Sequence, residues 1–164
     1  MKSQTTFEKT FGGLCQNGGY SVSEVADSGF VFTGYWSNGV GCGNTLFHMK
    51  TNKNGIASWT KQHKKVPGSL FAVGFSLIKT SDAGFAMVGS STPDNINNQE
   101  CYIVKTNSNG DTLWTKLYGD ENTVFISNAY SIKQTSDNGF ILAGWKVNGN
   151  EQYPYLIKTN SSRS

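Results

Sequence analysis

Aromatic side chains next to amides and carboxylates are the residues of this sequence best suited to recognising a ligand. Trp36 and Trp145 each lie beside stretches rich in Asn, Asp and Gly. An indole ring stacks on the apolar face of a sugar, while amides hydrogen-bond its hydroxyl groups. We therefore predict a glycan- or protein-binding site with these candidate residues: Trp36, Asn38, Asp94, Asn95, Asn97, Trp145 and Asn148. The alternative, in which both tryptophans only cover the core of their strands, stays open.

The residues that usually carry catalysis form no constellation in the sequence. His48 and His63 fall in expected strands, and neither has a partner at the spacing of metal ligands. A pair of carboxylates for glycoside hydrolysis would have to come from the loops, where nothing positions two of them together. The carboxylates concerned are Asp94, Glu100, Asp120, Glu121 and Glu151. We expect no enzyme, no cofactor and no metal site, and a glycoside-active hydrolase is the least favoured alternative.

The charge of the chain excludes some classes of partner. The 164 residues carry a net charge of +3, only 15% are charged, and Arg163 is the single arginine. Nucleic-acid binders show a denser basic patch and use Arg for bidentate contacts, so no nucleic acid is expected. No stretch reaches the roughly 18 consecutive apolar residues of a membrane span, so no membrane insertion is expected. The N-terminus lacks an apolar signal segment, and a secreted protein would have lost its signal peptide.

Three cysteines leave one without a partner inside the chain. Cys15 and Cys42 fall in two loops that we expect at the same end of one repeat, so they can form a disulfide in an exported protein. Cys101 begins an expected strand, at a position that Leu46 and Pro154 occupy in the other repeats. We expect Cys101 to be a small buried apolar residue.

An internal repeat determines what positions these residues. Residues 20–34, 75–89 and 130–144 align without gaps at an offset of 55, and residues 46–55, 101–110 and 154–160 recur behind them. Trp59 and Trp114 recur too, which predicts that they pack between successive repeats. Such a fixed period is typical of repeat architectures.

Each repeat predicts four short antiparallel strands, represented by residues 130–135, 140–145, 102–106 and 111–118. The first hairpin turn reads Ser-Asp-x-Gly, in which we expect Gly to adopt the positive φ, and the second reads Asn-x-Asn-Gly. Four-stranded repeats are typical of β-propeller blades. The prediction is an all-β, single-domain propeller over residues 1–164, with blades at about 18–63, 73–118 and 129–160. A β-solenoid is the alternative, but it predicts shorter coils without regular hairpins.

The ends of the sequence predict how such a ring would close. Residues 5–11 align with residues 112–118, so they are an outer strand without a blade before it, and the third blade lacks this strand. Propellers usually have four to eight blades. We therefore expect a head-to-tail homodimer with six blades, in which residues 5–11 complete the third blade of the partner. A fragment of a longer propeller is the alternative.

The repeat resembles the propeller repeats of bacterial secreted and surface proteins, which are common in Bacteroidetes-type organisms. The pattern that carries this resemblance is Tyr-Ser-Ile-x-Gln-Thr-Ser-Asp-x-Gly-Phe-Ile-x-Ala-Gly, followed by Tyr-Leu-Ile-Lys-Thr-Asn. The resemblance implies a secreted or cell-surface location. Because the two hairpin turns hardly vary and the remaining connections do, we expect binding at the variable end. The expected function is a non-catalytic module that recognises a glycan or a protein, and the alternative is a purely structural part of a larger adhesin.

Overall fold

The computed structural model describes residues 7–12, 15–37, 43–63, 71–92, 99–119 and 126–161. Within these ranges the chain forms eleven strands and no helix, which confirms the all-β fold class. The strands are β1 (Gly18–Glu24), β2 (Phe30–Ser37), β3 (Asn44–Thr51), β4 (Ala57–His63), β5 (Phe71–Lys79), β6 (Phe85–Thr92), β7 (Glu100–Thr106), β8 (Thr112–Tyr118), β9 (Ser127–Gln134), β10 (Phe140–Asn148) and β11 (Glu151–Lys158).

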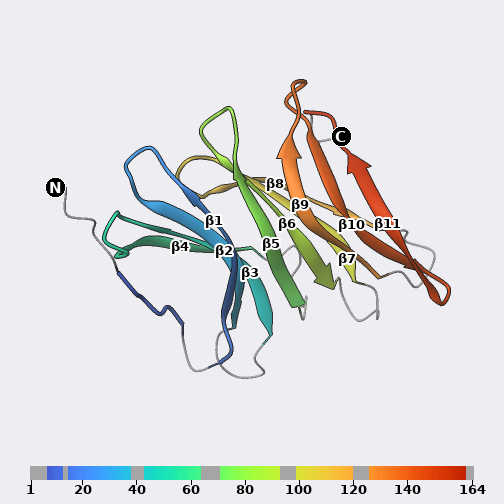
Figure 1. Ribbon diagram of the computed structural model, residues 1–164, viewed down its shortest axis with the longest axis horizontal. Helices are drawn as coiled ribbons and strands as arrows, with labels where there is room; N and C mark the ends of the chain where they lie inside the picture. The colour runs from blue at the N-terminus through green and yellow to red at the C-terminus, as the bar shows by residue number, and fades with distance from the viewer. Residues whose placement is uncertain are drawn as a thin grey trace.

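The strands form three antiparallel units that follow one another along the molecule, as Figure 1 shows. Unit 1 comprises β1 to β4, unit 2 comprises β5 to β8, and unit 3 comprises β9 to β11. The predicted blades would be separate sheets. In the structure, however, a parallel bridge between Asn44 and Phe71 joins units 1 and 2 into one eight-stranded sheet. A parallel bridge between Gln99 and Ile126 recurs 55 residues later, between units 2 and 3. The described strands do not close into a ring.

The core lies between the units rather than inside any one of them. One cluster joins Val31 and Leu46 of unit 1 to residues of unit 2 such as Met87. A second cluster joins unit 2 to unit 3, with Ile103 and Leu142 among its members. A single sheet has two apolar faces, and stacking against a neighbour removes them from water. Trp59 and Trp114 pack against these clusters, which confirms the prediction that they lie between repeats.

The first hairpin turn of each unit corrects a prediction about glycine. The positive φ belongs to the residue before the glycine, with values of 60°, 63° and 60° at Ser28, Ala83 and Asn138. The glycine is required for a different reason. A Cβ at Gly84 would lie 2.1 Å from the carbonyl oxygen of Thr106 in β7. The turn therefore presses its backbone against the third strand of its own unit, where no side chain fits.

An ion pair closes the same turn in every unit. The Asp of the turn binds the Lys of the third strand in the pairs Asp27–Lys50, Asp82–Lys105 and Asp137–Lys158, with N–O distances of 2.6, 2.8 and 2.6 Å. Lys105 is the most buried of the three lysines, and its ammonium also donates to the carbonyl of Thr106. The recurring aspartates thus join two hairpins, a role that turn geometry alone did not predict.

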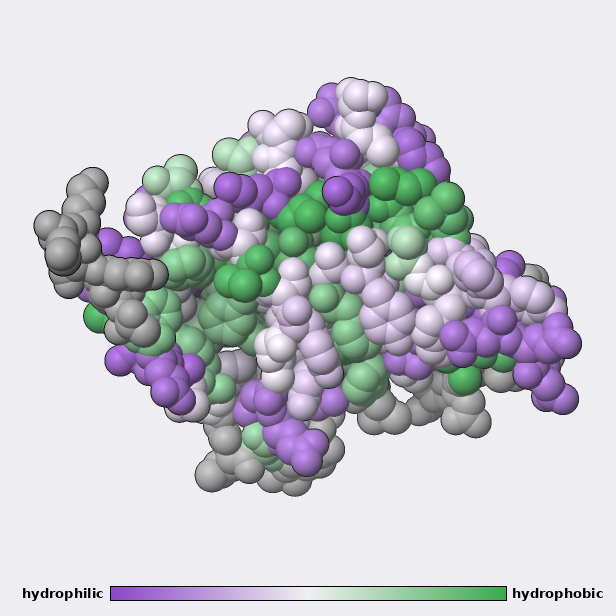
Figure 2. All heavy atoms as spheres, in the orientation of Figure 1, coloured by the Kyte–Doolittle hydropathy of each residue, from purple (hydrophilic) through white to green (hydrophobic). Residues whose placement is uncertain are grey.

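A β-bulge in the first strand of each unit places an aromatic residue at the same repeat position. The register shifts at Tyr20 in β1, at Phe75 in β5 and at Tyr130 in β9. The rings meet across the units, with centroids 5.2 Å apart for Tyr20 and Phe75, and 4.7 Å apart for Phe75 and Tyr130. Figure 2 shows hydrophobic residues across the middle of the face in view and hydrophilic residues mostly around its periphery. The aromatic row holds consecutive units side by side.

In the single chain the N-terminal segment forms no strand, and its expected pairing with a partner copy stays a prediction. Residues 7–12 form no strand, and residues 5 and 6 lie outside the described part of the chain. Phe7 and Phe11 instead pack on Phe30 and Phe32 of β2, with ring centroids 6.0 and 5.5 Å apart. Since no neighbouring strand in the described residues pairs with this segment, its backbone has no ladder that would hold it extended.

Candidate functional site

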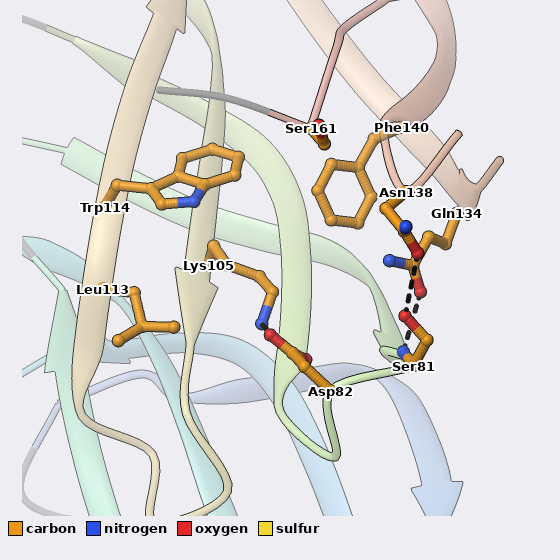
Figure 3. Close-up of a pocket in the computed structure, with 9 residues that line it drawn as sticks. All are labelled: Ser81, Asp82, Lys105, Leu113, Trp114, Gln134, Asn138, Phe140 and Ser161. Atoms are coloured by element: carbon orange, nitrogen blue, oxygen red, sulfur yellow. Dashed lines mark hydrogen bonds and ion pairs between the residues drawn. The ribbon is translucent and has the colours of Figure 1, made fainter. Parts of the chain in front are cut away.

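An open pocket of about 350 Å³ lies between units 2 and 3, at the end of the strands where the short hairpin turns gather (Figure 3). The half-buried indole of Trp114 in β8 and the ring of Phe140 in β10 form its apolar walls, with centroids 6.0 Å apart. Polar groups complete the lining: Ser81, Asp82, Lys105, Gln134, Asn138 and Ser161. Leu113 lies beside Trp114. The pocket thus combines an aromatic wall with amides and hydroxyls.

Hydrogen bonds between the two units fix the polar side of this pocket. The backbone N–H of Ser81 donates to Oε1 of Gln134 over 2.8 Å, and the Ser81 hydroxyl lies 3.1 Å from Oδ1 of Asn138. These contacts use the oxygens of both amides. The Nε2 of Gln134 and the Nδ2 of Asn138 therefore remain as donors for a ligand, since each amide carries two N–H bonds.

The carboxylate in the pocket is held in its charged form. Burial of Asp82 acts to raise its pKa, but hydrogen bonds from Lys105, Thr80 and the N–H of Gly84 outweigh this effect and lower the pKa to about 2. Both carboxylate oxygens accept from the Lys105 ammonium, at 2.9 and 2.8 Å. Asp82 is therefore suited to accept hydrogen bonds, whereas a general acid needs a raised pKa.

The same pocket recurs between units 1 and 2, where its volume is about 560 Å³. Its residues Ala26, Asp27, Lys50, Lys79, Ala83, Phe85 and Ser108 occupy the repeat positions of Ser81, Asp82, Lys105, Gln134, Asn138, Phe140 and Ser161. The ion pair and the phenylalanine are retained, but Lys79 and Ala83 replace the two amides, and Trp59, the counterpart of Trp114, does not line this pocket. The repeat therefore builds one type of site at each junction between units and varies its polar groups.

A buried histidine pair lies beside the junction of units 1 and 2. Nε2 of His63 lies 2.9 Å from Nδ1 of His48, and Nδ1 of His63 lies 2.9 Å from the hydroxyl of Thr112 in unit 2. His48 is fully buried, and its Nε2 has no hydrogen-bond partner within the described structure. Trp59 packs on the ring of His48, with centroids 4.8 Å apart. The sequence did not predict this pair.

Burial keeps both histidines neutral. Desolvation lowers the pKa of His48 to about 3, with a further contribution from the nearby His63 and Lys61. Desolvation and the Lys61 ammonium lower the pKa of His63 to about 4. Each neutral ring carries one N–H, and one of these two protons makes the hydrogen bond between the rings, whereas a third proton would place a positive charge in the core. Their chemistry is therefore that of a structural hydrogen bond that acid disrupts.

Of the predicted binding residues that the structure describes, Trp36 lies in unit 1, and Trp145 and Asn148 lie in unit 3. Trp36 in β2 is half-buried against Phe47, whereas Trp145 in β10 belongs to the other sheet and donates from Nε1 to the hydroxyl of Tyr130 over 3.2 Å. Asn148 is exposed at the end of β10. Asn38, Asp94, Asn95 and Asn97 lie outside the described residues. The predicted variable-end site remains a prediction, whereas the two repeated pockets lie at the opposite end, with the invariant turns.

The cysteines differ in state. Cys15 is disulfide-bonded, but Cys42 lies outside the described residues, so the expected bridge between them stays a prediction. Cys101 is free and completely buried, as the sequence predicts, and this burial raises the pKa of its thiol to about 12.

Neither metal ligands nor relatives point to a further site. Among the residues that the structure describes, no three His, Cys, Asp or Glu side chains are grouped so that they could hold a metal ion. The same part of the chain contains no helix of the length and apolarity that crossing a membrane requires. No protein-family model matches the sequence, and a search of curated proteins finds no match.

Proposed function

We propose that the chain is a non-catalytic glycan-recognition module, in which the pocket between units 2 and 3 holds a saccharide. The observation that carries this proposal is a pocket that recurs at two junctions with a phenylalanine and an Asp–Lys pair, and that gains Trp114 and two amides between units 2 and 3. Trp114 offers a ring for stacking, Gln134 and Asn138 offer donors, and Asp82 offers an ionised acceptor. This combination matches the alternating apolar and hydroxyl-bearing surface of a sugar.

The proposed architecture is that of β-propeller blades in a secreted or cell-surface protein. Consecutive units share the same parallel bridge and the same aromatic contacts, so each unit is placed on the next in the same way. A ring that two copies close with six blades is the form we propose. The disulfide at Cys15 supports an exported location, because disulfides persist in oxidising compartments.

Removing the amide of Asn138 should weaken saccharide binding without disturbing the turn. Asn138 has a φ of 60°, which glycine adopts freely, so Asn138→Gly leaves the backbone unstrained. One or two lost hydrogen bonds correspond to about 10-fold weaker binding. Ligand-observed NMR with galactose, glucose, mannose, fucose and N-acetylglucosamine would identify a bound sugar, and calorimetry would give its affinity for each variant.

Asn148→Ala is the matched control, since Asn148 is an exposed amide outside the pocket and belongs to the site predicted from the sequence. The proposal expects its affinity to equal that of the wild type. Loss of binding in Asn148→Ala together with full binding in Asn138→Gly would place the site at the variable end. If the folded protein binds none of these sugars, the scaffold of a larger adhesin becomes the better interpretation.

A further inference from the structure

We infer that β11 of one copy pairs with residues 7–11 of a second copy, in the register that units 1 and 2 already use, and that this contact completes a further pocket. The inference rests on the proposed ring architecture and specifies the partner, the strand edge and the residues that face each other. It is carried by three observations on the terminal units: exposed apolar faces, the placement of Phe7, and the free edge of β11.

The outward faces of the terminal units expose positions that are buried elsewhere in the repeat. Val22 in unit 1 is 66% exposed, whereas Leu77 at the same position of unit 2 is 5% exposed because unit 1 covers it. At the other end Leu156 in β11 is 68% exposed, whereas the equivalent Ile103 in β7 is fully buried. The outward face of unit 1 therefore matches the face by which unit 2 packs on unit 1. The outward face of unit 3 matches the face by which unit 2 packs on unit 3, so the two outward faces are complementary. A head-to-tail contact between two copies would bury both.

Phe7 already occupies the place of an outer-strand residue from a preceding unit. The ring pair Phe7–Phe30 has a centroid distance of 6.0 Å and an interplanar angle of 59°. The corresponding pair Trp114–Phe140, between units 2 and 3, has 6.0 Å and 61°. A Cβ on Gly55 would touch Phe7, as a Cβ on the equivalent Gly110 would touch Trp59. Residues 7–11 therefore sit on unit 1 as β8 sits on unit 3, although they have no strand beside them.

The free edge of β11 supplies the missing neighbour. Among the described strands β11 pairs only with β10. In unit 2 the third strand pairs with the outer strand at Lys105↔Trp114, Ile103↔Lys116 and Cys101↔Tyr118. The same register places Lys158 opposite Phe7, Leu156 opposite Lys9 and Pro154 opposite Phe11 of the second copy. Proline is compatible with this position, because the N–H of the equivalent Cys101 donates to the Ser127 hydroxyl.

The contact would also build a pocket that neither copy contains alone. Asp137 and Lys158 of unit 3 supply the ion pair, as Asp82 and Lys105 do in the pocket of Figure 3. Phe7 and Phe30 of the second copy stand at the positions of Trp114 and Phe140. Saccharide binding at this third junction would therefore depend on dimerisation.

A pair of engineered cysteines tests the register. Lys9→Cys combined with Leu156→Cys should give a covalent dimer of twice 17.9 kDa on a denaturing gel after mild oxidation, and reduction should return the monomer. The matched control combines Lys9→Cys with Ile157→Cys, whose side chain points to the opposite face of β11, so it should not cross-link. Equal cross-linking in both variants, or in the wild type, would overturn the register.

Leu156→Arg tests the interface itself. Because Leu156 is exposed in the chain, a charge there should leave each unit folded but block edge pairing. We expect light scattering to show a dimer for the wild type and a monomer for Leu156→Arg, with the same circular dichroism spectrum. A wild-type protein that is monomeric at 100 µM overturns the inference. These readouts involve no sugar, so their failure is distinguishable from failure of the proposed glycan binding.

Discussion

At pH 5 the free energy of unfolding should be about 3 kcal/mol lower than at pH 7, because His48 and His63 must take up protons that the folded state excludes. In the unfolded chain both titrate near their ordinary value of 6.5, whereas their folded pKa values are about 3 and 4. The part of the unfolding free energy that depends on these two neutral rings is therefore fully present above pH 6.5, and it decreases as the pH falls from there toward 4. Urea unfolding followed by tryptophan fluorescence at both pH values measures the difference.

The histidine pair lies where unit 1 contacts unit 2, so its protonation destabilises that contact. Thr112, which faces His63, belongs to unit 2, and Lys61 beside the pair binds Asp111 of unit 2 over 2.9 Å. Among the described residues no carboxylate contributes to the pKa of either ring, and the Lys61 ammonium adds repulsion to any positive charge. Protonation thus acts at the junction between units 1 and 2.

The repeat itself supplies the control variant. Unit 2 carries Ile103 and Tyr118 where unit 1 carries His48 and His63, so the double variant His48→Ile, His63→Tyr copies a pair that the fold already accommodates. Its unfolding free energy should change by less than about 1 kcal/mol between pH 7 and pH 5. The aspartates with lowered pKa values titrate below their ordinary 3.8, outside this window. An unchanged pH dependence in the double variant would rule out the histidines as its cause.

Gly89→Ala should destabilise the protein by about 3 kcal/mol or more, since the new methyl group would meet backbone that cannot yield. A Cβ at Gly89 would lie 1.8 Å from the carbonyl oxygen of Val73. Gly89 pairs with Gly74 next to the bulge at Phe75, where β5 bends toward β6. Straightening the bulge would displace Phe75 from the aromatic row, so the cost includes contacts between units. Urea unfolding of the variant gives the loss of stability directly.

Gly19→Ala is the matched control for this substitution. Its Cβ would lie 3.6 Å from the ring of Phe32, which is ordinary van der Waals contact, and its φ is not positive. We expect a change within about 0.5 kcal/mol. Similar losses in Gly19→Ala and Gly89→Ala would mean that replacing any strand glycine is costly and that the close approach is not the cause.

The strands could be predicted from the sequence because the pattern of each strand recurs in two or three repeats. The segment 102–106 was predicted within β7 (Glu100–Thr106), and 111–118 differs from β8 by one residue. The conformation of the first turn was predicted wrongly. A Gly after a polar residue fits a positive φ, but here the carbonyl of the third strand, distant in sequence, excludes a side chain at Gly84. Contacts of this kind are set by packing and not by the turn sequence.

The histidine pair could have been inferred from register, whereas the pockets could not. The hairpin of β3 and β4 places Lys61 opposite His48 and Leu46 opposite His63, so the two histidines are diagonal neighbours on one face. The pocket lining, by contrast, combines Ser81 and Trp114 of one unit with Gln134 and Asn138 of the next. Periodicity within a unit specifies its two faces but not how far the next unit is rotated upon it.

Because only one backbone bridge joins each unit to the next within the described residues, at Asn44↔Phe71 and Gln99↔Ile126, side chains carry nearly all of the coupling between the units there. Such an array behaves like a row of linked two-state segments, each stabilised mainly by its immediate neighbours. In a single chain, melting is then expected to start at a terminal unit and to move inward, whereas in the proposed ring every unit has two neighbours. A lineage could also lengthen the protein by duplicating a unit of 55 residues, since the added copy would meet surfaces that already fit it.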